Sequence, residues 1–175
     1  RGARLPAVWA AAAALAIHAG ALYDEFHLDD ESAILESAGV RSPRTARDLL
    51  ESFLRVEGRP LTVLSYRLDW GIWGPGEGES LDPYDPSFYT GLHAWGFHLS
   101  QWLLCGLCAA AWAVLARRLG AGPAAAALAG TALAAHPLFS HLAAYVSART
   151  DQIALLGTLL ALAGAAPARP RGRDA

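Results

Sequence analysis

Four apolar stretches restrict the fold of this chain more than any other feature of its 175 residues. They lie at residues 5–22, 88–116, 123–135 and 151–166, and charged or turn-forming residues bound each of them. A helix of about 20 apolar residues can cross a hydrocarbon core of about 30 Å. With 54% hydrophobic and 17% charged residues, the chain is also more apolar than an ordinary soluble domain. We therefore expect an all-α, polytopic membrane protein with about four transmembrane helices.

These stretches divide the chain into predicted segments. A cleaved signal peptide is the alternative for the first stretch, but signal cores are typically about 7 to 15 residues long, so we expect a retained helix. The fourth stretch is short, and a start near residue 143 is an alternative. The predicted segments are a first transmembrane helix at 1–22, an extracytoplasmic loop at 23–87, a second transmembrane helix at 88–118, a third at 119–137, a second loop at 138–150, a fourth helix at 151–166 and a basic end at 167–175.

The arginines predict which side of the membrane each loop occupies. There is no Lys, and in the four-helix arrangement seven Arg residues fall on one side. Cytoplasmic flanks are enriched in basic residues, so this side is predicted to be cytoplasmic and both large loops extracytoplasmic. The seven are Arg1, Arg4, Arg117, Arg118, Arg169, Arg171 and Arg173.

The first loop has the composition of a folded segment. Of the 16 acidic residues, 14 lie between Asp24 and Asp85. Residues 42–54 have helical spacing, and residues 74–86 are rich in Gly, Pro and Glu. Between them, residues 61–73 form an apolar-aromatic stretch, which predicts a helix in the membrane interface, where Trp and Tyr are enriched.

Several kinds of site are not predicted. Cys105 and Cys108 lack a second pair or a basic cluster that would complete a zinc or redox site, and we expect them to be buried small residues. The pairs His93/His98 and His136/His141 are five residues apart and do not share a helical face, so no metal site is predicted; a ligand set drawn from separate loops is the alternative. The chain has no P-loop, G-x-G-x-x-G or G-x-S-x-G motif, and no nucleic-acid partner is expected. Because it contains no Met, we expect it to be part of a longer protein.

Two groups of charged residues are candidates for chemistry. Asp29 and Asp30 follow the first apolar stretch and could supply a general base; a solvated acidic turn or helix N-terminus is the alternative. Arg149 and Asp151 stand at the entrance to the fourth stretch, where ionisable groups are costly unless paired or serving a site. Arg149 is suited to a lipid phosphate, and an Arg–Asp pair or an interfacial anchor is the alternative.

Four motifs in order resemble the transmembrane, tetratricopeptide-repeat-containing O-mannosyltransferases and their bacterial relatives in the GT-C superfamily. The similarity extends from about residue 23 to 162. The motifs are Leu28-Asp29-Asp30 with Ala33-Ile34, the run from Arg59 to Leu68, Phe97-His98-Leu99, and Ala135-His136-Pro137-Leu138 running on to Ala148-Arg149-Thr150-Asp151.

This resemblance implies a membrane glycosyltransferase that takes a sugar from a polyprenyl-phosphate carrier and transfers it to a hydroxyl acceptor by inverting displacement. Asp29 or Asp30 would be the general base, and the resemblance implies no obligatory cofactor. Arg149, with Arg59 and His136, would bind the carrier phosphate, and Asp151 completes the implied substrate-binding set. The implied location is a bacterial inner membrane with the catalytic loops in the periplasm; an endoplasmic reticulum membrane is the alternative.

The chain departs from the family pattern at four positions. Gly58 replaces an aromatic residue, Gln101 and Cys105 replace Asn and His, and His141 replaces a Glu. The loss of the Glu favours a second hypothesis, a non-catalytic scaffold or degenerate relative that binds a partner through its acidic loop. A transporter subunit is a third hypothesis, but it predicts more charged positions within the spans than the chain contains.

Overall fold

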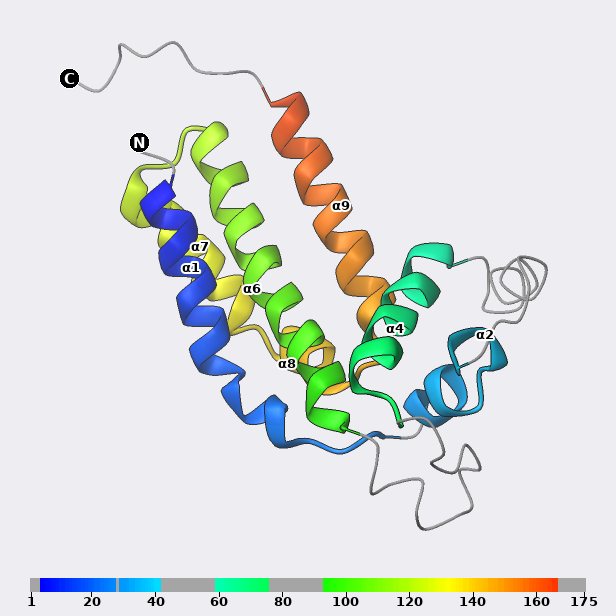
Figure 1. The fold of residues 1–175 in the computed structure, drawn as a ribbon. Coiled ribbons are helices and arrows are strands. Elements are labelled where there is room, and N and C mark those ends of the chain that lie inside the picture. The colour runs from blue at the N-terminus through cyan, green and yellow to red at the C-terminus, as the bar shows by residue number, and fades with distance from the viewer. Residues whose placement is uncertain (1–3, 28, 42–58, 76–92, 167–175) are drawn as a thin grey trace. The chain divides into compact units, whose positions relative to one another are not determined.

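The computed structural model describes residues 4–27, 29–41, 59–75 and 93–166, and every regular element among them is helical (Figure 1). The all-α prediction is therefore confirmed for these residues. The chain divides into two compact units. Unit 1 comprises residues 1–19, 102–141 and 151–175, and unit 2 comprises residues 20–101 and 142–150.

Unit 1 is built from long apolar helices whose ends follow from the sequence. Pro123 and Pro137 stand in the first turns of α7 and α8, where a missing N–H costs nothing. Gly120, two residues after the end of α6, has a φ of 102°. The N–H groups of Gly120 and Ala121 donate to the carbonyls of Arg117 and Ala116. These hydrogen bonds end the helix, and Gly is common at such a position because it tolerates a positive φ. The helices are α1 (Arg4–Ile17), α6 (Ala94–Arg118, from residue 102), α7 (Pro123–Ala134), α8 (Pro137–Ala144, up to residue 141) and α9 (Arg149–Ala165, from residue 151).

Small residues allow the helices of unit 1 to approach closely. Gly130 of α7 is buried, and a Cβ atom added to it would lie 2.5 Å from the Cβ of Ala10 in α1 and 2.7 Å from the carbonyl oxygen of Ala109 in α6. Only a residue without a side chain fits between them. Close approach at small residues is typical of helix packing in membranes.

Larger side chains and polar contacts complete this unit. Ala111 and Leu115 of α6 pack with Leu159 and Ala163 of α9. The indole Nε1 of Trp102 donates to the carbonyl of Leu15 over 2.8 Å. Hydrogen bonds therefore supplement the packing of apolar side chains in this unit.

The two cysteines are free and buried, as the sequence predicted. The Nε2 of Gln152 lies 2.9 Å from the Sγ of Cys105, and the Sγ of Cys108 donates to the Gln152 carbonyl over 3.6 Å. Both thiols thus serve the contact between α6 and α9.

Unit 2 contains shorter helices around a core of its own. The core draws on the first loop, α4, the beginning of α6 and the turn before α9. Its helices are a 3₁₀ helix (Ala19–Tyr23), a π-helical turn (Glu31–Leu35), α2 (Ala38–Arg41), α4 (Pro60–Trp73) and the first residues of α6. Its core consists of Ile34, Leu35, Val40, Val63, Tyr66, Trp70, Phe97 and Val146.

The helix predicted at 61–73 is confirmed as α4. The predicted helical spacing at 42–54, most of the Gly/Pro/Glu stretch at 74–86 and the basic end at 167–175 lie outside the described residues. The segment boundaries proposed for the whole chain stay predictions.

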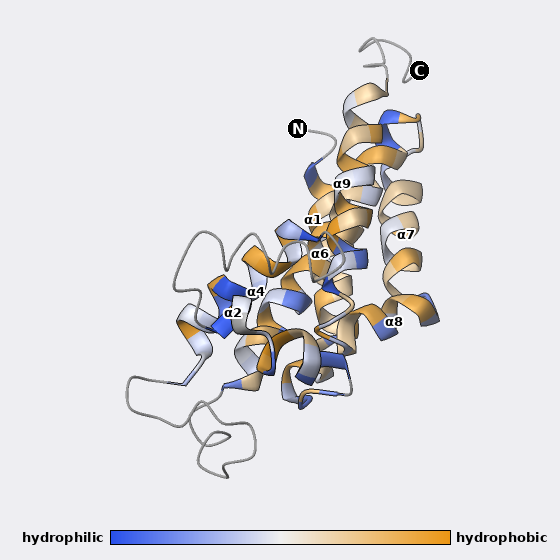
Figure 2. Cartoon of the chain, turned by 90° about the vertical axis from the view of Figure 1, so that its right-hand side faces the viewer, coloured by the Kyte–Doolittle hydropathy of each residue, from blue (hydrophilic) through white to orange (hydrophobic). Residues whose placement is uncertain are grey.

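One helix among the described residues, α6, is long and apolar enough to cross a membrane, a property that it shares with buried core helices of soluble proteins. It overlaps the predicted second span. Helices α1, α7 and α9 fall where the other spans were predicted, but they have 14, 12 and 17 residues. Apolar residues dominate α7 and α9 in Figure 2. The number of spans therefore stays a prediction.

Candidate functional site

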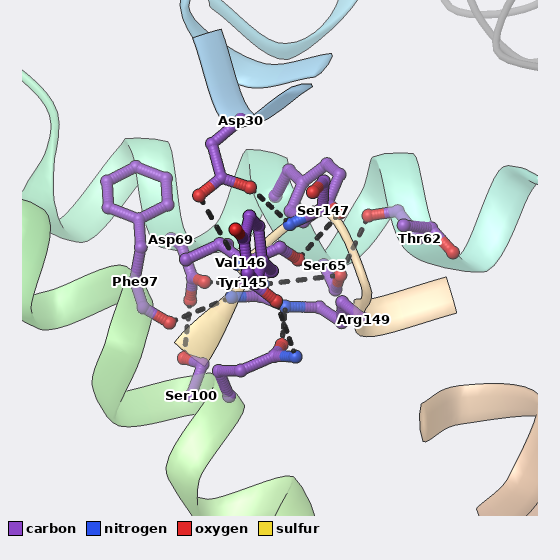
Figure 3. A network of polar contacts seen from close by, with 12 residues as sticks. Asp30, Thr62, Ser65, Asp69, Phe97, Ser100, Tyr145, Val146, Ser147 and Arg149 are labelled. Carbon is purple, nitrogen blue, oxygen red and sulfur yellow. Dashed lines mark hydrogen bonds and ion pairs between the residues drawn. The ribbon is translucent and has the colours of Figure 1, made fainter. Parts of the chain in front are cut away.

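The candidate site lies within unit 2, where residues from four parts of the chain form one polar network (Figure 3). They come from the segment before the π-helical turn, from α4, from the first turns of α6 and from the turn of residues 145–148 that leads into α9. The sequence predicted two members of this network, Asp30 and Arg149.

Asp30 is fully buried, and both of its carboxylate oxygens accept hydrogen bonds from backbone N–H groups. Oδ1 accepts from Ser147 over 2.6 Å. Oδ2 accepts from His27 over 3.1 Å and from Val146 over 3.4 Å. A buried carboxylate is tolerated when donors satisfy its oxygens in this way. Asp30 therefore holds its own loop to the turn before α9.

Asp29 has the opposite environment, because its side chain is exposed. Its backbone carbonyl accepts a hydrogen bond from the hydroxyl of Ser32 over 3.1 Å. Of the two adjacent carboxylates, Asp29 is the one that a ligand can reach.

Arg149 is fully buried, and its guanidinium donates to protein acceptors from three nitrogens. Nη1 lies 2.5 Å from Asp69 Oδ2 and 3.4 Å from Ser65 Oγ. Nη2 donates to the carbonyl of Phe97 over 2.9 Å, and Nε donates to Gln101 Oε1 over 3.2 Å. Charge-assisted hydrogen bonds of this kind compensate a buried cation. Residues of unit 2 therefore supply both the counter-charge and the hydrogen-bond acceptors of the guanidinium.

A second layer of contacts fixes the partners of Arg149. The other oxygen of Asp69 accepts from the hydroxyl of Ser100 over 2.6 Å. The amide nitrogen of Gln101 donates to the carbonyls of Leu142 and Tyr145 over 2.5 and 3.0 Å. The side chains of Asp69 and Gln101, two of the four acceptors of the guanidinium, are therefore themselves held in position.

The aromatic ring of Tyr66 packs against the Arg149 guanidinium. Its ring centroid lies 4.8 Å from the Arg149 Cζ, within the range of a cation–π interaction. Its hydroxyl donates to the carbonyl of Val146 over 2.9 Å. Burial raises the pKa of the Tyr66 phenol above its ordinary value, so the group stays a neutral donor.

The turn of residues 145–148 is thus fixed from two directions. Asp30 binds its N–H groups, and Tyr66 binds the carbonyl of Val146. The turn continues directly into α9. The hydroxyl of Thr150, in the first turn of α9, lies 3.1 Å from the hydroxyl of Thr62 in α4. The predicted base segment and the predicted phosphate-binding Arg are therefore linked through this turn.

The other predicted site residues have exposed side chains. Arg59 precedes α4 in unit 2, and its carbonyl accepts from the N–H groups of Thr62 and Val63. His136 and Asp151 belong to unit 1. The His136 Nδ1 accepts from the N–H of Leu138 over 3.2 Å, and Asp151 stands in the first turn of α9.

The sequence did not single out Asp69, Ser65 or Ser100. Asp69 carried a usable signal, because it is the one acidic residue in the apolar-aromatic stretch at 61–73, and an acid buried in such a helix needs a partner. The partner is 80 residues away, and spacing alone could not identify it. Gln101 was noted for its difference from the family pattern, and its contacts with Arg149 were not predicted.

No protein-family model, curated protein or solved structure matches this chain. Among the residues that the structure describes, no three His, Cys, Asp or Glu side chains are grouped so that they could hold a metal ion. The functional case rests on the polar network and on the two Asp residues.

Proposed function

We propose that the chain is part of a GT-C type membrane glycosyltransferase that transfers a sugar from a polyprenyl-phosphate carrier to a hydroxyl acceptor with inversion. One observation carries the proposal. Asp30 hydrogen-bonds to the N–H groups of Val146 and Ser147, 116 and 117 residues further along the chain. This contact joins the segment with the proposed base to the turn that precedes the proposed phosphate-binding residue, Arg149.

The two aspartates take different roles in this proposal. Asp29 is exposed and acts as the general base, because both oxygens of Asp30 are already occupied by backbone donors. Asp29 accepts the proton of the acceptor hydroxyl, and the hydroxyl oxygen forms a bond to the anomeric carbon. The bond between that carbon and the carrier phosphate breaks, and polyprenyl phosphate leaves with the electron pair. A positioned base of this kind contributes about 10²- to 10⁴-fold to a rate.

The cationic residues have their proposed role at the leaving group. The Asp69 carboxylate lies 2.5 Å from the Nη1 of Arg149. When the donor binds, an oxygen of the carrier phosphate would replace this carboxylate as the acceptor of the guanidinium. Arg59 and His136, both exposed, are proposed as further phosphate contacts, and Asp151 as a further substrate contact. The reaction needs no metal in this scheme, because the leaving phosphate is stabilised by cationic side chains.

The proposed setting is a membrane crossed by about four helices, with the loop that carries Asp29 on the extracytoplasmic side. Support comes from α6, which has the length and composition of a span, and from the one-sided distribution of Arg residues. A bacterial inner membrane is the proposed location, and an endoplasmic reticulum membrane is the alternative.

A second candidate function is a non-catalytic membrane scaffold or degenerate relative. The engagement of Arg149 favours it, because the guanidinium is fully buried and its charge is already balanced by Asp69. A ligand phosphate would have to displace an existing ion pair. The enzyme and the scaffold therefore make opposite predictions for donor binding.

The deciding experiment compares Asp29→Asn with Asp30→Asn in membrane vesicles that hold the full-length protein and its endogenous acceptors, supplied with tritiated polyprenyl-phosphate mannose and, separately, with the glucose donor. We expect Asp29→Asn to bind the donor and to unfold at the wild-type temperature, yet to lose sugar transfer to endogenous acceptors. Asp30→Asn is expected to lower the unfolding temperature, because an amide donor would face backbone N–H groups. Full sugar transfer by Asp29→Asn would refute the role of Asp29 as the general base. A folded wild-type protein that binds neither donor would favour the scaffold.

A further inference from the structure

His98 is a polar side chain that unit 2 buries without a hydrogen bond. It lies near the beginning of α6 and is fully buried. Among the residues that the structure describes, neither Nδ1 nor Nε2 of its ring has a hydrogen-bond partner. A buried polar group without a partner destabilises the folded state, and such groups in native proteins call for an explanation.

The neighbouring polar groups of unit 2 are treated differently. Both oxygens of Asp30 accept hydrogen bonds, and three nitrogens of Arg149 donate them. Asp69 and Gln101 are likewise held by donors and acceptors. Packing alone would favour an apolar residue in place of His98, so its polar ring points to a role in function.

The ring of His98 packs against the segment that leads to the proposed base, Asp29. Its centroid lies 6.2 Å from that of the Phe26 ring, three residues before Asp29. The ring of Phe26 also meets the ring of Phe97 at 72°, with 5.3 Å between the centroids. Phe26 therefore connects this segment to two successive residues of α6.

The backbone of the same segment offers His98 an acceptor. The carbonyl of Glu25 lies beside the imidazole, but outside hydrogen-bonding geometry. Residues 24–27 are not helical, so the Glu25 peptide can rotate toward the ring without breaking a helix. Hydrogen bonds that serve a reaction are often long or misaligned in the free enzyme and tighten when the substrate is bound.

We propose that His98 is a positioning residue for sugar transfer. In the donor-bound protein its imidazole N–H donates to the Glu25 carbonyl and so fixes the segment that presents Asp29. A neutral imidazole has one N–H donor, and this bond satisfies it. Because His98 is fully buried, it acts on the acceptor through this segment and not by contact. The inference rests on the proposed function, and it concerns the alignment of the base and not the binding of the carrier phosphate.

The test replaces His98 with Leu, which has a similar volume and no polar atom. Transfer is measured in membrane vesicles that hold the full-length protein, supplied with tritiated polyprenyl-phosphate mannose or the glucose donor. We expect the maximal rate to fall about 10- to 100-fold, because a misplaced catalytic group is costly, while the KM for the donor stays unchanged. The unfolding temperature of the purified variant, followed by circular dichroism, should equal or exceed that of the wild type, because an unsatisfied polar group has been removed.

The control for this test is His93→Leu, at an exposed position just before α6, which should transfer sugar at the wild-type rate. Two further variants examine whether the N–H donor carries the effect. The amide nitrogen of His98→Asn lies near the position of Nδ1, and that of His98→Gln lies near the position of Nε2. One of them should restore most of the rate, which a purely structural role would not predict.

Wild-type transfer by His98→Leu would overturn the inference. A lower unfolding temperature of His98→Leu would overturn it too, because His98 would then stabilise the fold. The same holds for a loss of rate that neither amide variant restores, since donation to a carbonyl would not be its cause. A folded wild-type protein that transfers neither sugar refutes the proposed function itself.

Discussion

Arg149 and Asp69 depend on each other, because both are buried and each neutralises the other. Their side chains are 1 and 7% exposed, and Nη1 lies 2.5 Å from Oδ2. Taking either charge out of water is costly, and the pair offsets that cost only while its geometry and its additional hydrogen bonds are kept. Ser100 and Gln101 supply such bonds. Within unit 2, we therefore expect the removal of either charged group of this pair to lower the stability most.

Asp69→Ala is expected to destabilise the protein by about 3 to 5 kcal/mol, because it leaves the guanidinium of Arg149 buried without its counter-charge. Thermal unfolding in detergent can be followed with a thiol-reactive dye, since Cys105 and Cys108 become accessible only on unfolding. Asp151→Ala is the matched control at an exposed acid and should change little. Equal unfolding temperatures for the two variants would contradict the buried pair.

Tyr66→Phe is expected to cost about 1 kcal/mol near neutral pH, through loss of the hydrogen bond to the Val146 carbonyl. The raised pKa of the folded phenol adds a pH dependence. Above the unfolded tyrosine pKa of about 10, the unfolded chain binds fewer protons than the folded one, so wild-type stability falls as the pH rises.

The difference between wild type and Tyr66→Phe should therefore shrink between pH 8 and pH 11. Circular dichroism during thermal unfolding measures it at both values. A difference that stays constant over this range would mean that the Tyr66 phenol is no harder to ionise in the folded protein.

At the scale of elements, the absence of a side chain at Gly130 allows α1, α6 and α7 of unit 1 to approach closely. Gly130→Ala would place a Cβ atom 2.5 Å from the Cβ of Ala10 and 2.7 Å from the Ala109 carbonyl. Because one of these contacts is with backbone, a helix must move, and overpacking of this kind costs about 1 to 3 kcal/mol.

Gly157→Ala is the control for this prediction, because open space surrounds the position where its Cβ atom would lie. The added methyl group should leave the unfolding temperature unchanged or raise it, since Ala favours a helix over Gly by about 1 kcal/mol. The same thiol-reactive dye assay measures both variants. If Gly130→Ala unfolds at the same temperature as Gly157→Ala, the three helices do not approach as closely at Gly130 as described.

At the scale of the whole molecule, the arginines predict how the chain is threaded through a membrane. A short split-fluorescent-protein tag inserted after Gly122 should complement a cytoplasmic detector, because Arg117 and Arg118 precede it and basic flanks stay inside. A tag inserted after Glu36 should remain dark. Signals from both insertions would exclude the arrangement in which α6 crosses the membrane between the two sites.

Much of the secondary structure was predictable because helix formation is local. The apolar-aromatic stretch at 61–73 became α4, and the stretch at 123–135 became α7. The burial of Cys105 and Cys108 followed from their apolar neighbours. The end of the first helix was less predictable: α1 ends at Ile17, and a 3₁₀ helix at Ala19–Tyr23 continues the apolar run.

The sequence by itself determined the helical class, the apolar segments and the short set of candidate residues, because these depend on composition and on neighbours along the chain. Only the tertiary structure decided that Asp30 is occupied and Asp29 accessible, and that Asp69 is the partner of Arg149. Asp29 and Asp30 are identical in chemistry and adjacent in sequence. Their difference arises from backbone donors 116 and 117 residues away, and folding alone brings such distant groups into contact.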